Sequence, residues 1–333
     1  MNAVRVAVLG ATGLVGQKIL EILAERNFPV RSLTALATEG HGRSVSFRGE
    51  AVPVCGVESM DWSSVDVAFF AASAEASRTY APIAADHGVT VIDKSSYFRM
   101  DPSVPLVVPE VNGDAIGDAR LIASPNCSTI QMVVALEPIR RQYGLKRIIV
   151  STYQAVSGTG REAMETLTDE TRRTLEDQTI TPSTYPTPIA FNVLPYCDKF
   201  GADDYTGEEW KLTRETQKIF GMSLPVSATA VRVPVYVSHA ESVYVETEKA
   251  FEVSLVHELL ARSPGVRVVD NPADGIVPIP LDAADQDLVL VGRLRRDLFV
   301  DNGLHMFVVA DNLRKGAATN AVQIVESLLS RWA

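Results

Sequence analysis

A short apolar run followed at once by three spaced glycines limits the fold of this chain more than any other feature. Val4 to Leu9 is rich in β-branched residues and predicts a strand, Gly10 to Gly16 has the spacing G-x-x-G-x-x-G, and Gln17 to Glu25 has apolar residues at helical intervals. A glycine-rich turn between a strand and a helix lets backbone N–H groups approach a pyrophosphate at the positive end of the helix dipole. The pattern predicts a dinucleotide-binding turn, with a tight turn that binds no ligand as the alternative.

The cofactor contacts expected at this turn come from Gly10, Thr12, Gly13, Leu14 and Val15. The end of the second predicted strand, at residues 38–43, then decides between the two nicotinamide cofactors. Glu39 favours NAD there because an acid binds the ribose hydroxyls, whereas Arg43, with His41, favours NADP because a cation binds the extra phosphate. The residues alone leave this choice open.

Strand and helix patterns divide the chain into two domains of an α/β protein. In the N-terminal part they predict a helix at 74–85 and further strands at residues 32–37, 65–71, 89–92 and 106–108. Such alternation is typical of a parallel, doubly wound sheet, so this part is predicted to be a Rossmann-like domain. From about Ile148 the predicted strands lengthen and alternate in polarity, notably at 231–237 and 242–247, which predicts an α+β domain with a mixed sheet.

Charge, hydropathy and cysteine usage exclude several classes of protein. The formal charge of −10 over 333 residues argues against nucleic-acid binding, which requires a concentrated cationic face. No apolar run approaches the roughly 18 residues of a membrane span, and the N-terminus lacks the features of a signal peptide. Cys55, Cys127 and Cys197 are too widely spaced for a disulfide framework or a zinc site. We therefore expect a cytoplasmic protein with no bound metal, no nucleic-acid partner and no membrane association.

Cys127 differs from the other two cysteines in its surroundings. It lies in Ser124-Pro125-Asn126-Cys127-Ser128-Thr129, directly before a helix predicted over Ile130 to Tyr143. A helix N-terminus favours the thiolate, and Asn126 can donate a hydrogen bond to an oxygen beside it, so Cys127 is the candidate nucleophile. A buried structural cysteine is the alternative, and it is the role expected for Cys55 and Cys197.

Eight short blocks, in order over nearly the whole chain, match the motifs of one enzyme family. They are GATG at 10–13, SYFR at 96–99, VPEVN at 108–112, PNCST at 125–129, STYQAVSG at 151–158, EEWK at 208–211, RVP through His239 at 232–239 and DNLRKGAA at 311–318. On these residues the chain resembles the aspartate-semialdehyde dehydrogenase family in its bacterial branch.

The resemblance implies a phosphorylating, NADPH-dependent aldehyde dehydrogenase. Such an enzyme reduces L-aspartyl 4-phosphate to L-aspartate 4-semialdehyde through a thioester on its cysteine, a step towards lysine, threonine, methionine and diaminopimelate. It implies a dinucleotide-binding domain at 1–126 plus 312–333 and a catalytic and dimerisation domain at 127–311. Besides the substrate and phosphate, the expected partner is a second copy of the chain, in a homodimer or a dimer of dimers.

The resemblance also assigns roles to single residues. The catalytic set is the nucleophile Cys127, the acid/base His239, and Gln154 near the reacting carbon. The substrate set is Arg99 and Lys211 for the phosphate, Asn126 beside it, Gln154, Glu208 for the ammonium, and Arg232 for the α-carboxylate. The remaining cofactor contacts are Gly40, His41, Ser157, Gly158 and Asn312.

Spacing adds two local predictions about the same residues. Thr206 to Glu209 has the pattern of a capping box with Gly221 as the helix stop, which places Glu208 and Lys211 on one helical face. Arg232 and His239 are seven residues apart, so they face opposite sides of a continuous strand. The strand must therefore end or bulge near Ser238 if both residues line one site.

The chain departs from the family pattern at two places on the expected cofactor side. Glu39-Gly40-His41 stands where the family has an Ala-Arg-Ser stretch for the NADP 2′-phosphate, and Lys94 stands where an Asn follows Asp93. The first departure leads to the hypothesis that NADP selectivity is reduced, or that NAD is used as well.

Two rival functions are considered. An N-acetylglutamyl-phosphate reductase is disfavoured because Glu208 suits a free ammonium. A catalytically silent relative is disfavoured because the catalytic set is retained.

Overall fold

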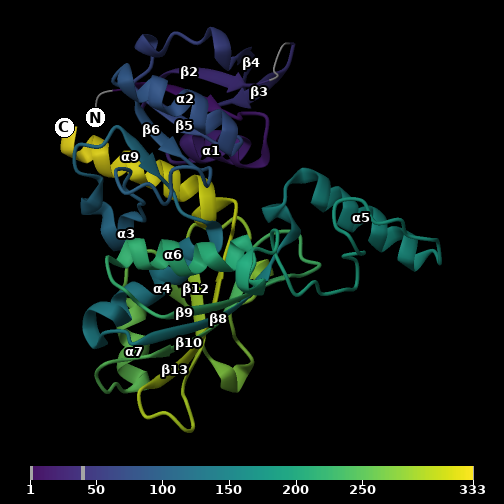
Figure 1. Cartoon of the computed structure of the whole chain (residues 1–333), viewed down its shortest axis with the longest axis vertical. Coiled ribbons are helices and arrows are strands. Elements are labelled where there is room, and N and C mark those ends of the chain that lie inside the picture. The colour runs from purple at the N-terminus through teal and green to yellow at the C-terminus, as the bar shows by residue number, and fades with distance from the viewer. Residues whose placement is uncertain (1–2, 39–41, 333) are drawn as a thin grey trace. The chain divides into compact units, whose positions relative to one another are not determined.

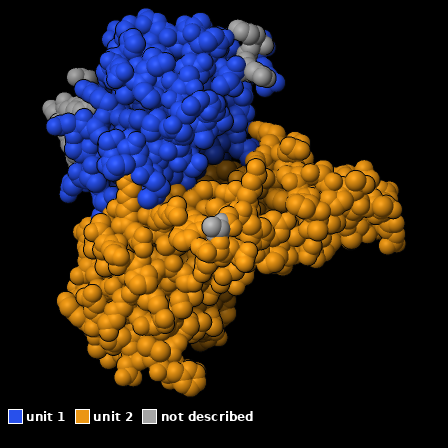
Figure 2. All heavy atoms as spheres, viewed as in Figure 1, with its two compact units in different colours: residues 1–126, 317–333 blue, residues 127–316 orange. Residues whose placement is uncertain are grey.

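The chain folds into two compact units, which are described separately below. The computed structural model describes residues 3–38 and 42–332. Unit 1 comprises residues 1–126 and 317–333, and unit 2 comprises residues 127–316 (Figure 2). By their contacts, residues 312–316 belong to unit 2, whereas the sequence had grouped them with the dinucleotide-binding domain.

A twisted, mostly parallel sheet is the centre of unit 1. Within the described residues, its seven strands follow the order β3-β4-β2-β1-β5-β6-β7, and β3 alone runs antiparallel to its neighbour (Figure 1). The strands are β1 (Val4–Leu9), β2 (Val30–Ala37), β3 (Ser44–Phe47), β4 (Glu50–Gly56), β5 (Val67–Phe70), β6 (Thr90–Asp93) and β7 (Leu121–Ala123). The predicted Rossmann-like domain is confirmed, although the β3–β4 hairpin was not predicted.

Four helices accompany this sheet in the described part of unit 1. They are α1 (Leu14–Glu25), α2 (Ala74–Asp86), α3 (Pro109–Asn112) and the C-terminal α9 (Thr319–Trp332). α9 packs against α1, and apolar residues of both helices join the strands in one buried core. The C-terminal helix therefore completes the core of unit 1.

The strand predicted at residues 106–108 is wrong. Leu106 makes only an isolated bridge to Ala123, and Pro109 begins α3 directly afterwards. Pro105 and Pro109 enclose the segment, and since proline has no N–H to donate, the ladder stays too short to form a strand.

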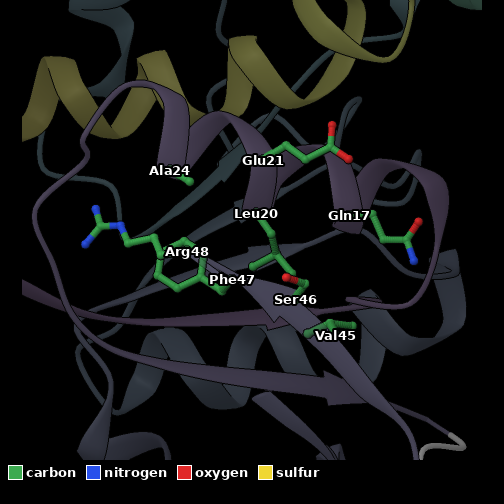
Figure 3. A pocket seen from close by; sticks show the side chains of 8 residues that line it. All are labelled: Gln17, Leu20, Glu21, Ala24, Val45, Ser46, Phe47 and Arg48. Atoms are coloured by element: carbon green, nitrogen blue, oxygen red, sulfur yellow. The ribbon is translucent and has the colours of Figure 1, made fainter. Parts of the chain in front are cut away.

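α1 and β3 line a small, open pocket of about 350 Å³ in unit 1 (Figure 3). Its lining residues are Gln17, Leu20, Glu21 and Ala24 of α1, Val45, Ser46 and Phe47 of β3, and Arg48. None of the glycines at 10–16 lines it, so this pocket is separate from the predicted cofactor turn.

A mixed sheet is the centre of unit 2. Six strands of the described chain follow the order β11-β12-β13-β10-β8-β9, with β8–β9 and β11–β12 parallel and the other pairs antiparallel. The strands are β8 (Arg147–Gln154), β9 (Val226–Arg232), β10 (His239–Glu246), β11 (Val266–Val268), β12 (Val289–Arg296) and β13 (Gly303–Ala310). The predicted mixed sheet is confirmed.

Two of the helices of unit 2 cover one face of this second sheet. The helices of unit 2 in the described residues are α4 (Cys127–Tyr143), α5 (Arg161–Leu175), α6 (Gly207–Phe220), α7 (Val253–Ala261) and the short α8 (Pro280–Ala283). α4 packs on β10, β12 and β13, and α6 packs on β9, whereas α5 extends away from the sheet (Figure 1). Alternation along β8 buries Val150 and Thr152 towards the helices and leaves Ile149 and Tyr153 exposed on the other face.

The strand predicted at 231–237 is also wrong, and its correction matters for the site. β9 ends at Arg232, β10 begins at His239, and the chain turns between them through Pro234 and through Ser238 at φ 77°. Pro234 cannot donate to a ladder, which stops the strand. The break expected near Ser238 is present, but it separates two strands that lie on either side of β8.

In the described part of the chain, no helix combines the length and the apolar composition that a membrane span requires.

Candidate active site

The glycine turn of unit 1 packs so closely against its neighbours that a side chain would not fit at two of its glycines. Gly10 has φ 84°, and a Cβ added there would lie 2.3 Å from the carbonyl oxygen of Ala71. A Cβ on Gly16 would lie 2.1 Å from the carbonyl oxygen of Gly10. Both positions therefore require glycine.

The N-terminus of α1 opens from this turn with the features of an anion-binding end. Gly13 is its N-cap, and in the described structure no side chain caps it and no acidic residue occupies the first turn. Thr12, Leu14 and Val15 are half-buried around it. Exposed N–H groups and the helix dipole at such an end fit a pyrophosphate. Glu39, Gly40 and His41 lie outside the described residues.

In unit 2, sheet register brings three predicted site residues to adjacent strand ends. Gln154, the last residue of β8, pairs with Arg232, the last residue of β9. On the other side of β8, Tyr153 pairs with Ala240, so His239 begins β10 next to Gln154. All three side chains are buried on the face that the helices cover. Gln154 thus forms one row with Arg232, which lies 78 positions later in the sequence, and with His239, which lies 85 positions later.

The backbone of Ala155 fixes the two ends of this row. Its N–H donates to His239 Nδ1 at 3.0 Å, and its carbonyl oxygen accepts from Arg232 Nη1 at 2.7 Å. Because Nδ1 accepts, a neutral imidazole has its proton on Nε2. Burial, and secondarily the charge of Arg232, lowers the pKa of His239 well below its ordinary value. His239 is therefore neutral at pH 7 with an N–H at Nε2, an atom without a hydrogen-bond partner among the described residues.

Gly158 and Asn312 define the surroundings of the row. A Cβ on Gly158 would lie 3.1 Å from Arg232 Nη1 and 3.2 Å from His239 Nε2, so a larger residue there would crowd both groups. The Asn312 Oδ1 accepts from the Ser238 N–H at 2.9 Å and from the Ser157 hydroxyl at 3.1 Å. Asn312 thereby supports the residue directly before His239 and contacts Ser157.

Glu208 connects the row to the cation Lys211. The capping box at Thr206 and the left-handed Gly221 are present as predicted, and α6 places both side chains on one face. Gln154 Nε2 donates to Glu208 Oε1 at 3.1 Å, and Lys211 Nζ lies 3.2 Å from Glu208 Oε2. Burial lowers the pKa of Lys211, but Glu208 and the hydrogen-bonded Asp198 outweigh it, and the net pKa is raised. Lys211 therefore remains a cation.

Cys127 is the first residue of α4 and is half-buried. A Cβ on Gly316 would lie 2.9 Å from the Cβ of Cys127, so only glycine fits beside the thiol. Burial raises the pKa of the Cys197 thiol to about 12, and the charges of Arg232, Glu208 and Cys127 also act on it. Cys197 therefore stays protonated. Cys55 is exposed, so the buried structural role expected for it is wrong.

Comparisons with known proteins show which family this chain resembles. Residues 5–119 match the model of the semialdehyde dehydrogenase NAD binding domain, and residues 136–315 match that of the semialdehyde dehydrogenase dimerisation domain. Aspartate-semialdehyde dehydrogenases from Aquifex aeolicus and Bacillus subtilis are 48% and 47% identical, with 98% of each chain covered. A crystal structure of the Vibrio cholerae enzyme II complexed with ASA has a TM-score of 0.97 at 45% identity, with 100% of both chains covered.

The chain belongs to the aspartate-semialdehyde dehydrogenase family. The resemblance read from the eight sequence blocks is thereby confirmed, together with the NAD(P)-binding domain and the dimerisation domain. This membership weighs against the rival reductase acting on an acylated amine.

The remaining predicted residues of this family member lie in unit 1. Arg99 and Asn126 are both buried, and Arg99 Nη2 donates to the Lys94 carbonyl oxygen at 2.8 Å. Lys94 Nζ donates to the Ser124 hydroxyl at 2.9 Å and to the Pro125 carbonyl oxygen at 3.3 Å. The family departure at Lys94 thus joins the Arg99 segment to the residues that lead into Cys127, an effect the sequence did not predict.

Two further contributors to the site escaped prediction. The first is the backbone of Ala155, whose contacts with His239 and Arg232 do not depend on its side chain and so leave no trace in the sequence. The second is Asp198, a loop residue whose carboxylate accepts a hydrogen bond from Lys211 Nζ at 2.8 Å. Ser238, near which the sequence predicts a break, has φ 77° directly before His239.

Proposed function

We propose that this aspartate-semialdehyde dehydrogenase reduces L-aspartyl 4-phosphate to L-aspartate 4-semialdehyde, with release of phosphate. The observation that supports it best is the row of Arg232, Gln154 and His239, joined to Glu208 and Lys211. A guanidinium suits the α-carboxylate, Glu208 suits the ammonium, and Lys211 suits the phosphate. The Vibrio cholerae relative, bound to ASA, supports the same substrate class.

The cofactor proposed is NADP, held on the N-terminus of α1 in unit 1. The residues fit a dinucleotide because Gly10 and Gly16 let backbone approach where a Cβ would clash, and because no acidic residue opposes an anion in the first turn of α1. When bound, the reduced nicotinamide supplies a hydride to the carbonyl carbon of the enzyme thioester. Ser157, Gly158 and Asn312 are the proposed neighbours of that ring.

Cys127 performs the covalent step in this proposal. Its thiolate attacks the acyl carbon of the substrate, the C–O bond to phosphate breaks, and phosphate leaves with the electron pair. Arg99 and Lys211 are proposed to neutralise the departing phosphate, with Asn126 donating beside it. After reduction, the thiohemiacetal collapses, the C–S bond breaks, and the thiolate is restored.

His239 is proposed to act on the oxygen of the reacting carbon. It holds a proton at Nε2, and this N–H donates a hydrogen bond as negative charge develops on the oxygen. The Ala155 N–H at Nδ1 fixes this tautomer and opposes an imidazolium, since Nδ1 cannot both accept and carry a proton. Hydrogen-bond donation is therefore the first role we propose, before the acid/base role that the sequence suggested.

The phosphate-dependent reverse reaction tests the function. Purified protein is assayed with aspartate semialdehyde, phosphate and NADP⁺, and we expect Cys127→Ala to lower kcat on the order of 10³-fold or more. Cys55→Ser is the matched control, because Cys55 is an exposed cysteine of unit 1 and outside the proposed machinery. Activity that survives in Cys127→Ala would contradict the proposal.

Cofactor selectivity and assembly need their own tests. We propose that the Glu39-Gly40-His41 segment weakens NADP selectivity, so kcat/KM with NAD⁺ should approach that with NADP⁺, and a strong NADP⁺ preference would contradict this.

We also propose a homodimer through the exposed face of the second sheet, where Ile149, Tyr153 and Phe307 lie. Tyr153→Glu should shift the mass measured by light scattering from dimer towards monomer.

A further inference from the structure

A carboxyl side chain buried beside the row has no role in the proposed mechanism. Glu241 lies two residues after His239 in β10 and is 0% exposed, although ionisable side chains are rarely buried without a partner. The sheet pairs it with Thr152 of β8 and Val308 of β13, neither of which is charged. Strand periodicity puts Glu241 on the same face as His239.

A buried amide from the helix of the nucleophile meets this carboxyl. Gln131 lies four residues after Cys127 in α4, about one helical turn, and is 0% exposed. α4 packs on β10, and Gln131 is the one side chain that acts on the pKa of Glu241 besides burial. Both carboxyl oxygens and both amide atoms are buried, and none of the four makes a hydrogen bond of full geometry among the described residues.

The two groups satisfy each other only if Glu241 is protonated. Burial raises the pKa of Glu241 well above its ordinary value, against a smaller effect of Gln131 in the other direction. A neutral acid can donate its O–H to the Gln131 carbonyl oxygen and accept from the Gln131 N–H. A carboxylate would leave that carbonyl oxygen without a donor, which is costly in a buried site.

We propose that Glu241 and Gln131 form a neutral hydrogen-bonded pair that positions Cys127 relative to His239. Gln131 is one helical turn from the thiol, and Glu241 is one strand repeat from the imidazole, so the pair fixes α4 against β10 at the two catalytic side chains. Both are positioning residues, because neither is placed against the substrate. The inference rests on the proposed function.

Variants that remove the pair while keeping side-chain volume provide the test. Glu241→Met and Gln131→Met should each lower kcat on the order of 10-fold to 100-fold, because small displacements of reacting groups cost this much, while KM for aspartate semialdehyde stays within about threefold. The rate of iodoacetamide alkylation at Cys127, followed by mass spectrometry of its peptide, should change as well. Glu241→Gln keeps a neutral donor and acceptor and should retain wild-type kcat within about threefold.

Two controls separate positioning from general stability and from the function itself. Val243→Ala shortens a buried side chain one strand repeat further along β10 and should lower the Tm while leaving kcat and alkylation unchanged. The exchanged double variant Gln131→Glu with Glu241→Gln keeps an acid opposite an amide, and it should keep kcat within about tenfold even if a methionine variant fails to fold.

The proposal is overturned if the methionine variants keep wild-type kcat, if Val243→Ala loses as much activity as they do, or if the exchanged pair is as inactive as the single removals. An inactive wild-type protein would instead contradict the proposed function. In that case the alkylation rates, which need no substrate turnover, still decide whether the pair positions Cys127.

Discussion

The two units build their candidate functional regions in opposite ways. In unit 1 the cofactor turn consists of backbone, and its specificity lies in the absence of side chains at Gly10 and Gly16. In unit 2 the site consists of buried polar side chains at the ends of β8, β9 and β10. A site made of backbone can be predicted from the spacing of glycines within a short segment. A site made of side chains depends on the order of the strands in the sheet, because residues far apart in the sequence must come together.

Removal of a side chain from the row should produce the largest effect. Arg232→Ala is expected to lower kcat/KM in the reverse assay on the order of 10³-fold, because it removes a buried guanidinium that the Ala155 carbonyl oxygen holds in place. Arg232→Lys should recover only part of this, since an ammonium cannot bind a carboxylate through two parallel hydrogen bonds. Equal activity of Arg232→Lys and wild type would show that the row does not use guanidinium geometry.

Gly10→Ala tests the backbone half of the comparison. Strain at φ 84° and the clash with the Ala71 carbonyl oxygen should together lower the free energy of unfolding by about 2–5 kcal/mol. Gly88→Ala is the matched control in the same unit, with φ 82° and nothing within 4 Å of the added Cβ, so only the strain remains. Equal losses in urea unfolding would mean that close approach at Gly10 is unimportant.

The same contrast explains how much of the fold and site was predictable. The turn at Gly10 and the capping box at Thr206 were predictable, because each is a local pattern with its own geometry. The position of β8 between β9 and β10 was not predictable, because the apolar alternation continues from Val231 across Pro234 and suggests a single strand. The Ala155 contacts were not predictable either, since they depend on which strands become neighbours. Family resemblance supplied the row residues that spacing could not.

Lys94 is a case in which unit 1 also uses a side chain. Its Nζ donates to Ser124 and Pro125, two of the residues that precede Cys127. Lys94→Met should lower the free energy of unfolding by about 1–3 kcal/mol, the usual cost of losing a charged hydrogen bond in a partly buried site. Thermal unfolding measures the loss, and iodoacetamide alkylation tests whether the Cys127 segment shifts with it. An unchanged Tm would show that these two hydrogen bonds contribute little.

The smallest expected effect is the change in folding stability per pH unit that is due to Glu241. The sign of this change tests whether unit 2 keeps Glu241 as a neutral, buried acid. Because burial raises the pKa of Glu241, the folded protein keeps a proton that the unfolded chain releases above about pH 4.5. The stability that Glu241 contributes is therefore present at low pH and is lost as pH rises towards the raised pKa, by at most about 1.4 kcal/mol per pH unit.

Glu241→Gln has no such proton, so its stability relative to wild type should increase from pH 5 to pH 7. Urea midpoints of both proteins across this range measure the difference, in which the other titrating groups cancel. Val243→Ala, which changes no titratable group, should keep a constant offset from wild type. A difference between Glu241→Gln and wild type that stays flat with pH would mean that Glu241 has the same protonation in both states, and a difference that falls would mean that the folded protein stabilises the carboxylate. Either result would remove the buried neutral acid from the description of unit 2 and leave Gln131 without the donor that its carbonyl oxygen needs.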